Sequence, residues 1–196
     1  MTDYFALLNQ SRRPWINPEQ VKQAFHARAL QMHPDAQLQQ NREPSSDALF
    51  AQLNQAYQVL QDPKRRLEHL LTLEGHPLDR APATTPPAIE ELFPTVAATT
   101  HRATAVVQQS AAATNVLART LLKSQLQNAN SDLETVREKV RALRNNAIDR
   151  LQRLDRSWSG EMGDQLEQLR VVYVELSYIT RWLSELDEKK LQLSTC

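Results

Sequence analysis

The stretch His33-Pro34-Asp35 separates two helical runs near the start of the chain. The first run spans Pro18 to Met32. The second, Asp47 to Gln61, follows a polar stretch from Ala36 to Ser46. Proline cannot continue a helix, and it pushes the residue before it toward an extended conformation. The sequence therefore predicts that the first helix closes at Met32 and His33. It also predicts that Asp35 begins a loop, where a polar triplet suits a docking point.

Apolar residues follow both runs at helical spacing. In the first run they are Val21, Ala24, Phe25 and Met32, and in the second they are Leu49, Phe50, Leu53, Ala56, Tyr57 and Leu60. Asn17 and Pro18 suit the start of the first helix, and Ser46 or Asp47 is placed to cap the second. The patterns predict an antiparallel helix pair with a short helix, residues 3–8, packed across it.

Residues 3–71 resemble a J-domain, the module by which co-chaperones engage DnaK-type ATPase chaperones. The resemblance covers the short first helix, the helix that ends in His33-Pro34-Asp35, the loop, and the third helix with the Asp62-Pro63-Lys64-Arg65-Arg66 that follows. It implies that the tripeptide docks on the ATPase chaperone together with the positive face of the second helix. The residues that match this docking surface are His33, Pro34, Asp35, Lys22, His26 and Arg28.

The basic face of the second helix is weaker here than in typical J-domains. Typical members often carry Lys or Arg at the positions of Gln23, Ala27, Gln31 and Ala36. Since opposite charges steer the encounter of two proteins, a weak face indicates a dedicated partner or a weakly bound one. A solvated helix face remains the alternative for Lys22 and His26.

The run from Arg66 to Gly75 reads Arg-Leu-Glu-His-Leu-Leu-Thr-Leu-Glu-Gly and resembles HscB-type co-chaperones of iron–sulfur cluster assembly. By its pattern it is one more helix with Gly75 as C-cap, and an arbitrary Leu-rich turn is the alternative. Prolines at 77, 82, 86 and 87 then indicate a linker. The predicted domains are a J-domain over 1–75, a Pro-rich linker over 76–87 and a C-terminal domain over 88–196.

Three helical patterns fill the C-terminal domain. The first is expected over about 89–126, with Pro94 as a kink or in the first turn, and Asn128-Ala129-Asn130 ends it. Ser131-Asp132-Leu133-Glu134 matches a capping box that opens the second helix, which continues to Trp158-Ser159-Gly160. The third is expected over 165–193. The fold class is therefore all-α, with the J-domain joined to an antiparallel three-helix bundle.

The bundle of HscB-type proteins holds the cluster scaffold protein, and the resemblance places that role on named residues here. Leu92, Phe93 and Val96 match the apolar patch of the first bundle helix, and Tyr178 matches the aromatic of the last. Core packing is the alternative for each of them. Family members carry several Glu residues after the patch, whereas residues 97–102 contain none. Glu90 and Glu91 stand on its other side.

Composition narrows the classes of function. The 23 basic and 23 acidic residues balance, which disfavours nucleic-acid and anionic-membrane binding. No apolar run approaches the roughly 20 residues of a membrane span. No signal peptide is visible in Met-Thr-Asp-Tyr. Cys196 is the single cysteine, which fits a reducing compartment and predicts a cytoplasmic protein.

No catalytic pattern stands out in the chain. A nucleophile elbow, a Gly-rich phosphate loop and metal-ligand spacing are all missing from the sequence. We therefore expect no enzyme activity, metal or cofactor. The expected function is stimulation of ATP hydrolysis by a DnaK-type chaperone and delivery of a client, the iron–sulfur scaffold. The alternatives are a different client, or a helical adaptor whose J-domain is vestigial.

Overall fold

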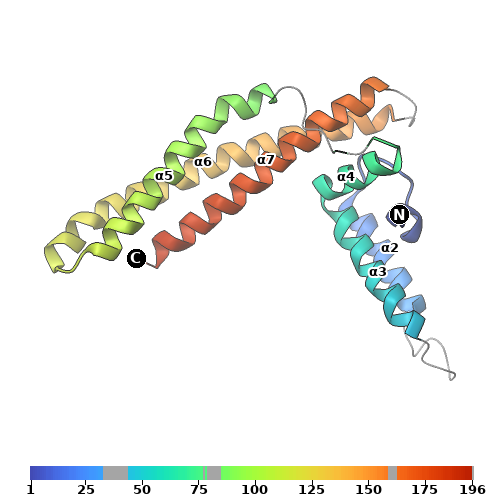
Figure 1. Cartoon of the computed structure of the whole chain (residues 1–196), viewed down its shortest axis with the longest axis horizontal. Coiled ribbons are helices and arrows are strands. Elements are labelled where there is room, and N and C mark those ends of the chain that lie inside the picture. Colours follow the sequence, from blue (N-terminus) through green and yellow to red (C-terminus); the bar gives the residue numbers. More distant parts are fainter. Residues whose placement is uncertain (33–43, 77, 79–84, 159–162, 196) are drawn as a thin grey trace. The chain divides into compact units, whose positions relative to one another are not determined.

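The computed structural model describes residues 1–32, 44–76, 78, 85–158 and 163–195. These residues form seven helices and no strand, which confirms the all-α prediction (Figure 1). The helices are α1 (Tyr4–Leu7), α2 (Pro18–Met32), α3 (Pro44–Gln61), α4 (Pro63–Leu73), α5 (Pro87–Ala112), α6 (Val116–Arg156) and α7 (Gly163–Ser194).

The chain divides into two compact units. The first unit comprises Met1–Ala81 and Asp149–Tyr173, and the second comprises Pro82–Ile148 and Val174–Cys196. Both α6 and α7 therefore contribute residues to each unit. The predicted domain bounds of 1–75, 76–87 and 88–196 remain a prediction, and residues 149–173 group with the N-terminal part of the chain.

The helix pair α2 and α3 forms the body of the first unit, with α1 and α4 packed on α3. Phe25 of α2 stacks on Tyr57 of α3, with ring centroids 4.6 Å apart. The fully buried side chains around this pair are Phe5, Leu8, Val21, Leu53, Ala56, Leu60, Leu67, Leu70 and Leu71. Their burial supplies the apolar area that holds four short helices together.

The helix ends in the first unit use the expected chemistry. Asn17 accepts a hydrogen bond from the Glu19 N–H (2.9 Å), and α2 begins at Pro18, as predicted. Asp62 caps α4 in the same way through the Arg65 N–H (2.8 Å). Gly75 follows α4 with φ +79°, a left-handed conformation that a residue without Cβ adopts without strain.

The start of α3 differs from the prediction. The helix begins at Pro44, three residues before the predicted start, so Ser46 and Asp47 lie in its first turn and do not cap it. Proline is well suited to the first turn, where its missing N–H would have no partner. Leu49 and Phe50 were placed on the buried stripe, yet both are exposed. The stripe that α3 buries begins at Leu53 and includes Val59.

His69 joins α1 to α4 in the first unit. Its Nε2 accepts a hydrogen bond from the Tyr4 N–H (3.0 Å), and its ring stacks on Tyr4 and Phe5 with centroids 4.5 and 5.7 Å away. Burial lowers the pKa of His69, although the Asp3 carboxylate opposes this shift. The imidazole is therefore neutral in the fold, because a protonated Nε2 can no longer accept this bond.

We expect the protein to lose stability below about pH 6.5, where the unfolded chain protonates His69 and the fold resists it. The contribution is complete above that pH and disappears as the pH falls toward the lower folded-state pKa. Urea unfolding at pH 7.5 and pH 5.5 measures the loss. His69→Gln keeps an acceptor without titrating and should reduce the difference, whereas the exposed His101→Gln should not. Equal pH dependence in both variants would refute the role of His69.

The second unit is built from α5 and from the adjoining parts of α6 and α7, side by side in Figure 1. Its buried apolar residues are Ile89, Val96, Ala103, Val106, Ala129, Leu133, Val136, Val140, Ala147, Leu176, Ile179, Trp182, Leu186 and Leu193. Ion pairs join α6 to both neighbours: Asp132 binds Arg102 of α5, and Arg137 binds Asp187 of α7 (2.7 Å). The predicted bundle of three helices is confirmed.

The division between the first two bundle helices was predicted in the wrong place. The break falls at residues 113–115, so Asn128-Ala129-Asn130 and the supposed capping box at 131–134 lie inside α6. Asn115 caps α6 by accepting the Ala118 N–H (2.7 Å), while Ala113 adopts an extended conformation. The polar triplet does not end the helix because Ala129 and Leu133 continue one buried stripe.

Two further points concern the ends of the bundle helices. Pro94 is the eighth residue of α5, so it is not in the first turn. In the described parts of the chain, each helix is too short or too polar to cross a membrane.

Candidate functional site

The predicted docking tripeptide begins where α2 stops. The helix ends at Met32, as the proline pattern predicts. His33, Pro34 and Asp35 lie outside the described residues. Their part in docking therefore remains a prediction from the sequence.

The basic residues of α2 divide between two sides of the helix. Lys22 and His26 are both exposed and stand four residues apart, so they share one face. Arg28 is half-buried and lies two positions beyond His26, which places it on another face. The structure therefore brings Lys22 and His26 together and leaves Arg28 apart from them.

A connector between α1 and α2 is attached to the end of α6 within the first unit. Arg13 binds Asp155 through Nε (3.2 Å) and Nη2 (2.8 Å), a two-pronged contact. The same carboxylate accepts the Trp15 N–H (3.2 Å). Trp158 donates its Nε1–H to the Arg12 carbonyl (3.0 Å). Residues 12–15 are thus held by the end of α6, about 140 residues away in sequence.

Asp155→Asn should weaken this attachment because it removes the charge from a buried carboxylate that accepts three donors. We expect the free energy of unfolding to fall by about 1–3 kcal/mol. The Trp15 amide should also exchange its hydrogen faster, which hydrogen–deuterium exchange measures residue by residue. Asp149→Asn, an exposed position one and a half turns earlier in α6, is the matched control. An unchanged Trp15 exchange rate would contradict the assignment.

The predicted client surface lies on α5 and α7 of the second unit. Phe93 exposes 51% of its surface, and Leu92 beside it is half-buried. Val96 is buried, so its side chain supports α5 from within and is not open to a partner. The exposed part of the predicted patch is therefore Phe93 with the edge of Leu92.

Trp182 connects the two halves of this patch, and the sequence analysis did not single it out. Its ring lies 6.2 Å from the Phe93 ring and 5.8 Å from the Tyr178 ring, centroid to centroid. Trp182 is buried, whereas Tyr178 is half-buried. Its spacing, three residues after Ile179 and four before Leu186, is a helical core spacing that identifies it in the sequence. Phe93 and Tyr178 therefore flank one buried aromatic ring.

The charge around Phe93 follows the sequence expectation. Glu90 and Glu91 are exposed in the first turns of α5, and Glu90 shares the Phe93 face because three residues separate them. Ala97, Ala98 and His101 extend the exposed face without an acid. Any acidic contact that α5 offers a partner here comes from Glu90 and Glu91.

The N-terminal part of the chain matches a known family. Residues 3–69 fit the model of the DnaJ domain. A chaperone protein DnaJ of Methanosarcina thermophila is 36% identical over 67 residues, 34% of this chain and 16% of that protein. A chaperone protein DnaJ 2 of Streptomyces coelicolor is 35% identical over 80 residues, 41% of this chain and 19% of that protein. The chain thus spans less than a fifth of these curated relatives.

One solved structure resembles the chain over nearly its full length. The chaperone HscB from Vibrio cholerae aligns with a TM-score of 0.55 and 20% identity, covering 99% of this chain and 96% of that one. At this identity the likeness concerns the fold, and it includes both the N-terminal module and the bundle. The chain carries a DnaJ domain at residues 3–69, within a whole-chain fold like that of HscB.

Proposed function

We propose that this protein is a J-domain co-chaperone that stimulates ATP hydrolysis by a DnaK-type chaperone and delivers a protein client to it. The DnaJ-domain match over residues 3–69 carries the proposal. That match includes His33-Pro34-Asp35 directly after α2. The chain itself turns over no substrate in this proposal, since the hydrolysis takes place on the partner.

Docking on the ATPase chaperone would use charge to orient the encounter. Lys22 and His26 present a small basic strip on the exposed face of α2. An acidic surface on the chaperone attracts such a strip and increases the rate of association, and the following Asp35 then sets the register. With Arg28 on another side of the helix, the strip is weak and favours a dedicated chaperone over a general one.

The iron–sulfur cluster scaffold is the client that we propose. The run from Arg66 to Gly75 resembles HscB-type co-chaperones, and the fold likeness to HscB extends through the bundle. The surface for the client is Phe93 and Leu92 of α5 with Tyr178 of α7, backed by Trp182. An exposed phenylalanine over a buried tryptophan is the kind of aromatic anchor that dominates protein interfaces.

A different client is the second candidate. Residues 97–102 offer no acid on the Phe93 face, so a basic scaffold surface meets only Glu90 and Glu91. Less complementary charge favours a client whose contact surface is apolar and closer to neutral. The same aromatic anchor serves both candidates.

Single-turnover ATP hydrolysis by the specialised DnaK-type chaperone of the organism separates the two clients. It is measured with this protein alone, with the scaffold alone and with both. If the scaffold is the client, both together accelerate hydrolysis far beyond either alone, since coupling between the two binding steps is reciprocal. If this protein stimulates and the scaffold adds nothing, the client is another protein. If this protein gives no stimulation, the co-chaperone proposal fails.

A further inference from the structure

The end of the bundle where α5 turns into α6 exposes three aliphatic side chains. Val116, Leu117 and Leu121 leave 81, 71 and 66% of their surfaces in contact with solvent. They stand within six residues of one helix, so they form one patch rather than scattered exposures. Contiguous exposed apolar surface of this kind marks a contact site, because burial against a partner removes it from water.

The third helix of the bundle does not reach this patch. Lys190 of α7 pairs with Glu134 of α6, and α7 ends four residues later, at Ser194. In an antiparallel pair that end lies level with about residue 130 of α6. The first turns of α6, roughly 20 Å at 1.5 Å per residue, therefore have only α5 beside them. Figure 1 shows the joined ends of α5 and α6 extending past the end of α7.

The surroundings of the patch are positively charged. From residue 92 to residue 131 the chain contains no Asp or Glu, although it contains Arg102, Arg119 and Lys123. Arg102 is paired with Asp132. Arg119 and Lys123 are exposed beside the patch and have no carboxylate partner among the described residues. Two unpaired cations therefore flank the exposed leucines.

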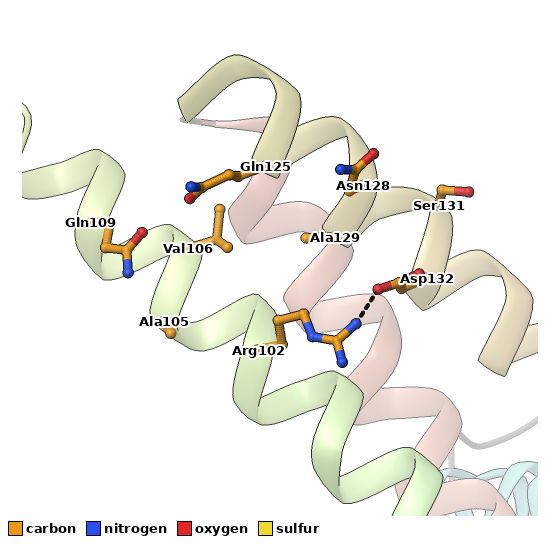
Figure 2. A pocket seen from close by; sticks show the side chains of 9 residues that line it. All are labelled: Arg102, Ala105, Val106, Gln109, Gln125, Asn128, Ala129, Ser131 and Asp132. Atoms are coloured by element: carbon orange, nitrogen blue, oxygen red, sulfur yellow. Dashed lines mark hydrogen bonds and ion pairs between the residues drawn. The ribbon is translucent and has the colours of Figure 1, made fainter. Parts of the chain in front are cut away.

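A groove of about 550 Å³ continues the patch along the bundle. It runs between α5 and α6, with Val106 and Ala129 as its buried floor, and Figure 2 shows Gln125 directed across it toward α5. The amides that line it belong to Gln109, Gln125 and Asn128. Leu121 and Leu117 lie one and two turns before Gln125 on the same side of α6, so the groove and the patch form one surface.

We propose that this surface, the α5–α6 tip surface, binds an acidic amphipathic helix of a partner protein. The apolar side of such a helix covers Leu117 and Leu121, and its flanking carboxylates pair with Arg119 and Lys123. The groove amides accept and donate hydrogen bonds to the polar side chains at its edge. Some 16 residues of α5 separate Gln109 from Phe93, so this partner does not compete with the client of the proposed function.

Two other occupants fit the surface less well. Recognition of anionic lipid uses clusters of about 4–8 basic residues, whereas this surface offers two. A second copy of the chain, packed tip to tip about a two-fold axis, brings Arg119 and Lys123 of both copies together. Like charges at close range oppose that pairing. A partner helix with Asp and Glu flanks has neither disadvantage.

Peptide selection on the full-length protein tests the proposal. The probe is a phage-displayed library of 18-residue helical peptides with randomised faces, selected on the immobilised chain at low salt. We expect enrichment of peptides that combine Leu, Ile or Phe at helical spacing with flanking Asp and Glu. A synthetic copy of the most enriched peptide is then titrated by fluorescence anisotropy.

Variants decide where the peptide binds. Leu117→Ser with Leu121→Ser should weaken binding about tenfold or more, and Arg119→Glu with Lys123→Glu should abolish the preference for acidic flanks. Matched controls are Leu191→Ser, an exposed leucine of α7, and Lys139→Glu with Arg144→Glu, exposed cations further along α6. These should bind as the native chain does. Circular dichroism confirms that every variant folds.

Three results would overturn the proposal. The first is a selection that yields no peptide, or only peptides whose binding survives the two leucine substitutions. In the second, vesicles of phosphatidylglycerol and phosphatidylcholine sediment with the native chain and not with the leucine variant. In the third, the native chain self-associates in sedimentation velocity and the leucine variant does not. The last two results would assign the surface to a membrane or to a second copy.

Discussion

Replacing Arg66 with alanine should lower the free energy of unfolding by about 3 kcal/mol, a large part of the stability of a small domain. The guanidinium is fully buried and donates to the Leu60 carbonyl (2.7 Å) and the Pro14 carbonyl (3.0 Å). It also lies 5.4 Å from the Trp15 ring centroid. Alanine leaves a cavity and deprives two buried carbonyls of their donors.

The charge of Arg66 makes the comparison with other substitutions informative. Burial lowers the pKa of Arg66 to about 10, with Asp62 and Asp155 opposing the shift, so the group stays ionised at neutral pH at a cost in desolvation. Arg66→Met keeps the volume and removes that cost, and it should lose only about 1–2 kcal/mol. Arg65→Ala, exposed and adjacent, should change stability by less than about 0.5 kcal/mol. Urea unfolding gives all three values, and equal midpoints for Arg66→Ala and Arg65→Ala would contradict this role.

Phe93→Ser combined with Tyr178→Ala should weaken binding of the scaffold about tenfold to a hundredfold, because both anchors beside Trp182 are removed. The cost in stability should be small, since Phe93 is half exposed and Tyr178 half-buried. Isothermal titration calorimetry with the scaffold measures the loss. Stimulation of ATP hydrolysis in the absence of client should remain unchanged, because the DnaJ domain is untouched.

Leu191→Ser provides the control for exposed apolar surface on α7 and should bind the scaffold normally. A double variant with native affinity for the scaffold would remove Phe93 and Tyr178 from the client surface. If the native chain does not bind the scaffold, the same variants can be tested against any client found by the ATPase assay.

Local chemistry in the sequence predicted most of the N-terminal fold. Asn17 and Pro18 set the start of α2, and the proline of the tripeptide set its end. The start of α3 was missed because a polar segment with proline fits both a loop and a first helical turn. The break before α6 was missed because Thr114 and Asn115 are a weaker signal than Asn128-Ala129-Asn130. Tertiary burial of Ala129 overrides the propensity of that triplet.

Contacts over long sequence separations explain what the sequence could not predict of the sites. No spacing rule relates Arg13 to Asp155, which the fold brings within 2.8 Å. The burial of Val96 depends on how α5 is rotated against α7, and helical periodicity alone does not set that rotation. Trp182 is different, since its spacing marks it as a core residue and only its contact with Phe93 needed the structure.

The most direct test of the proposed function is single-turnover ATP hydrolysis by the partner DnaK-type chaperone with Asp35→Ala in place of the native chain. We expect native protein to stimulate hydrolysis and Asp35→Ala to lose that stimulation, while Asp149→Ala, an exposed aspartate of α6, retains it. Both variants should still bind the client, because the bundle is unchanged. An Asp35→Ala protein that stimulates as well as the native chain would contradict a J-domain co-chaperone. A native chain that gives no stimulation yet keeps its protein contacts would show a helical adaptor instead.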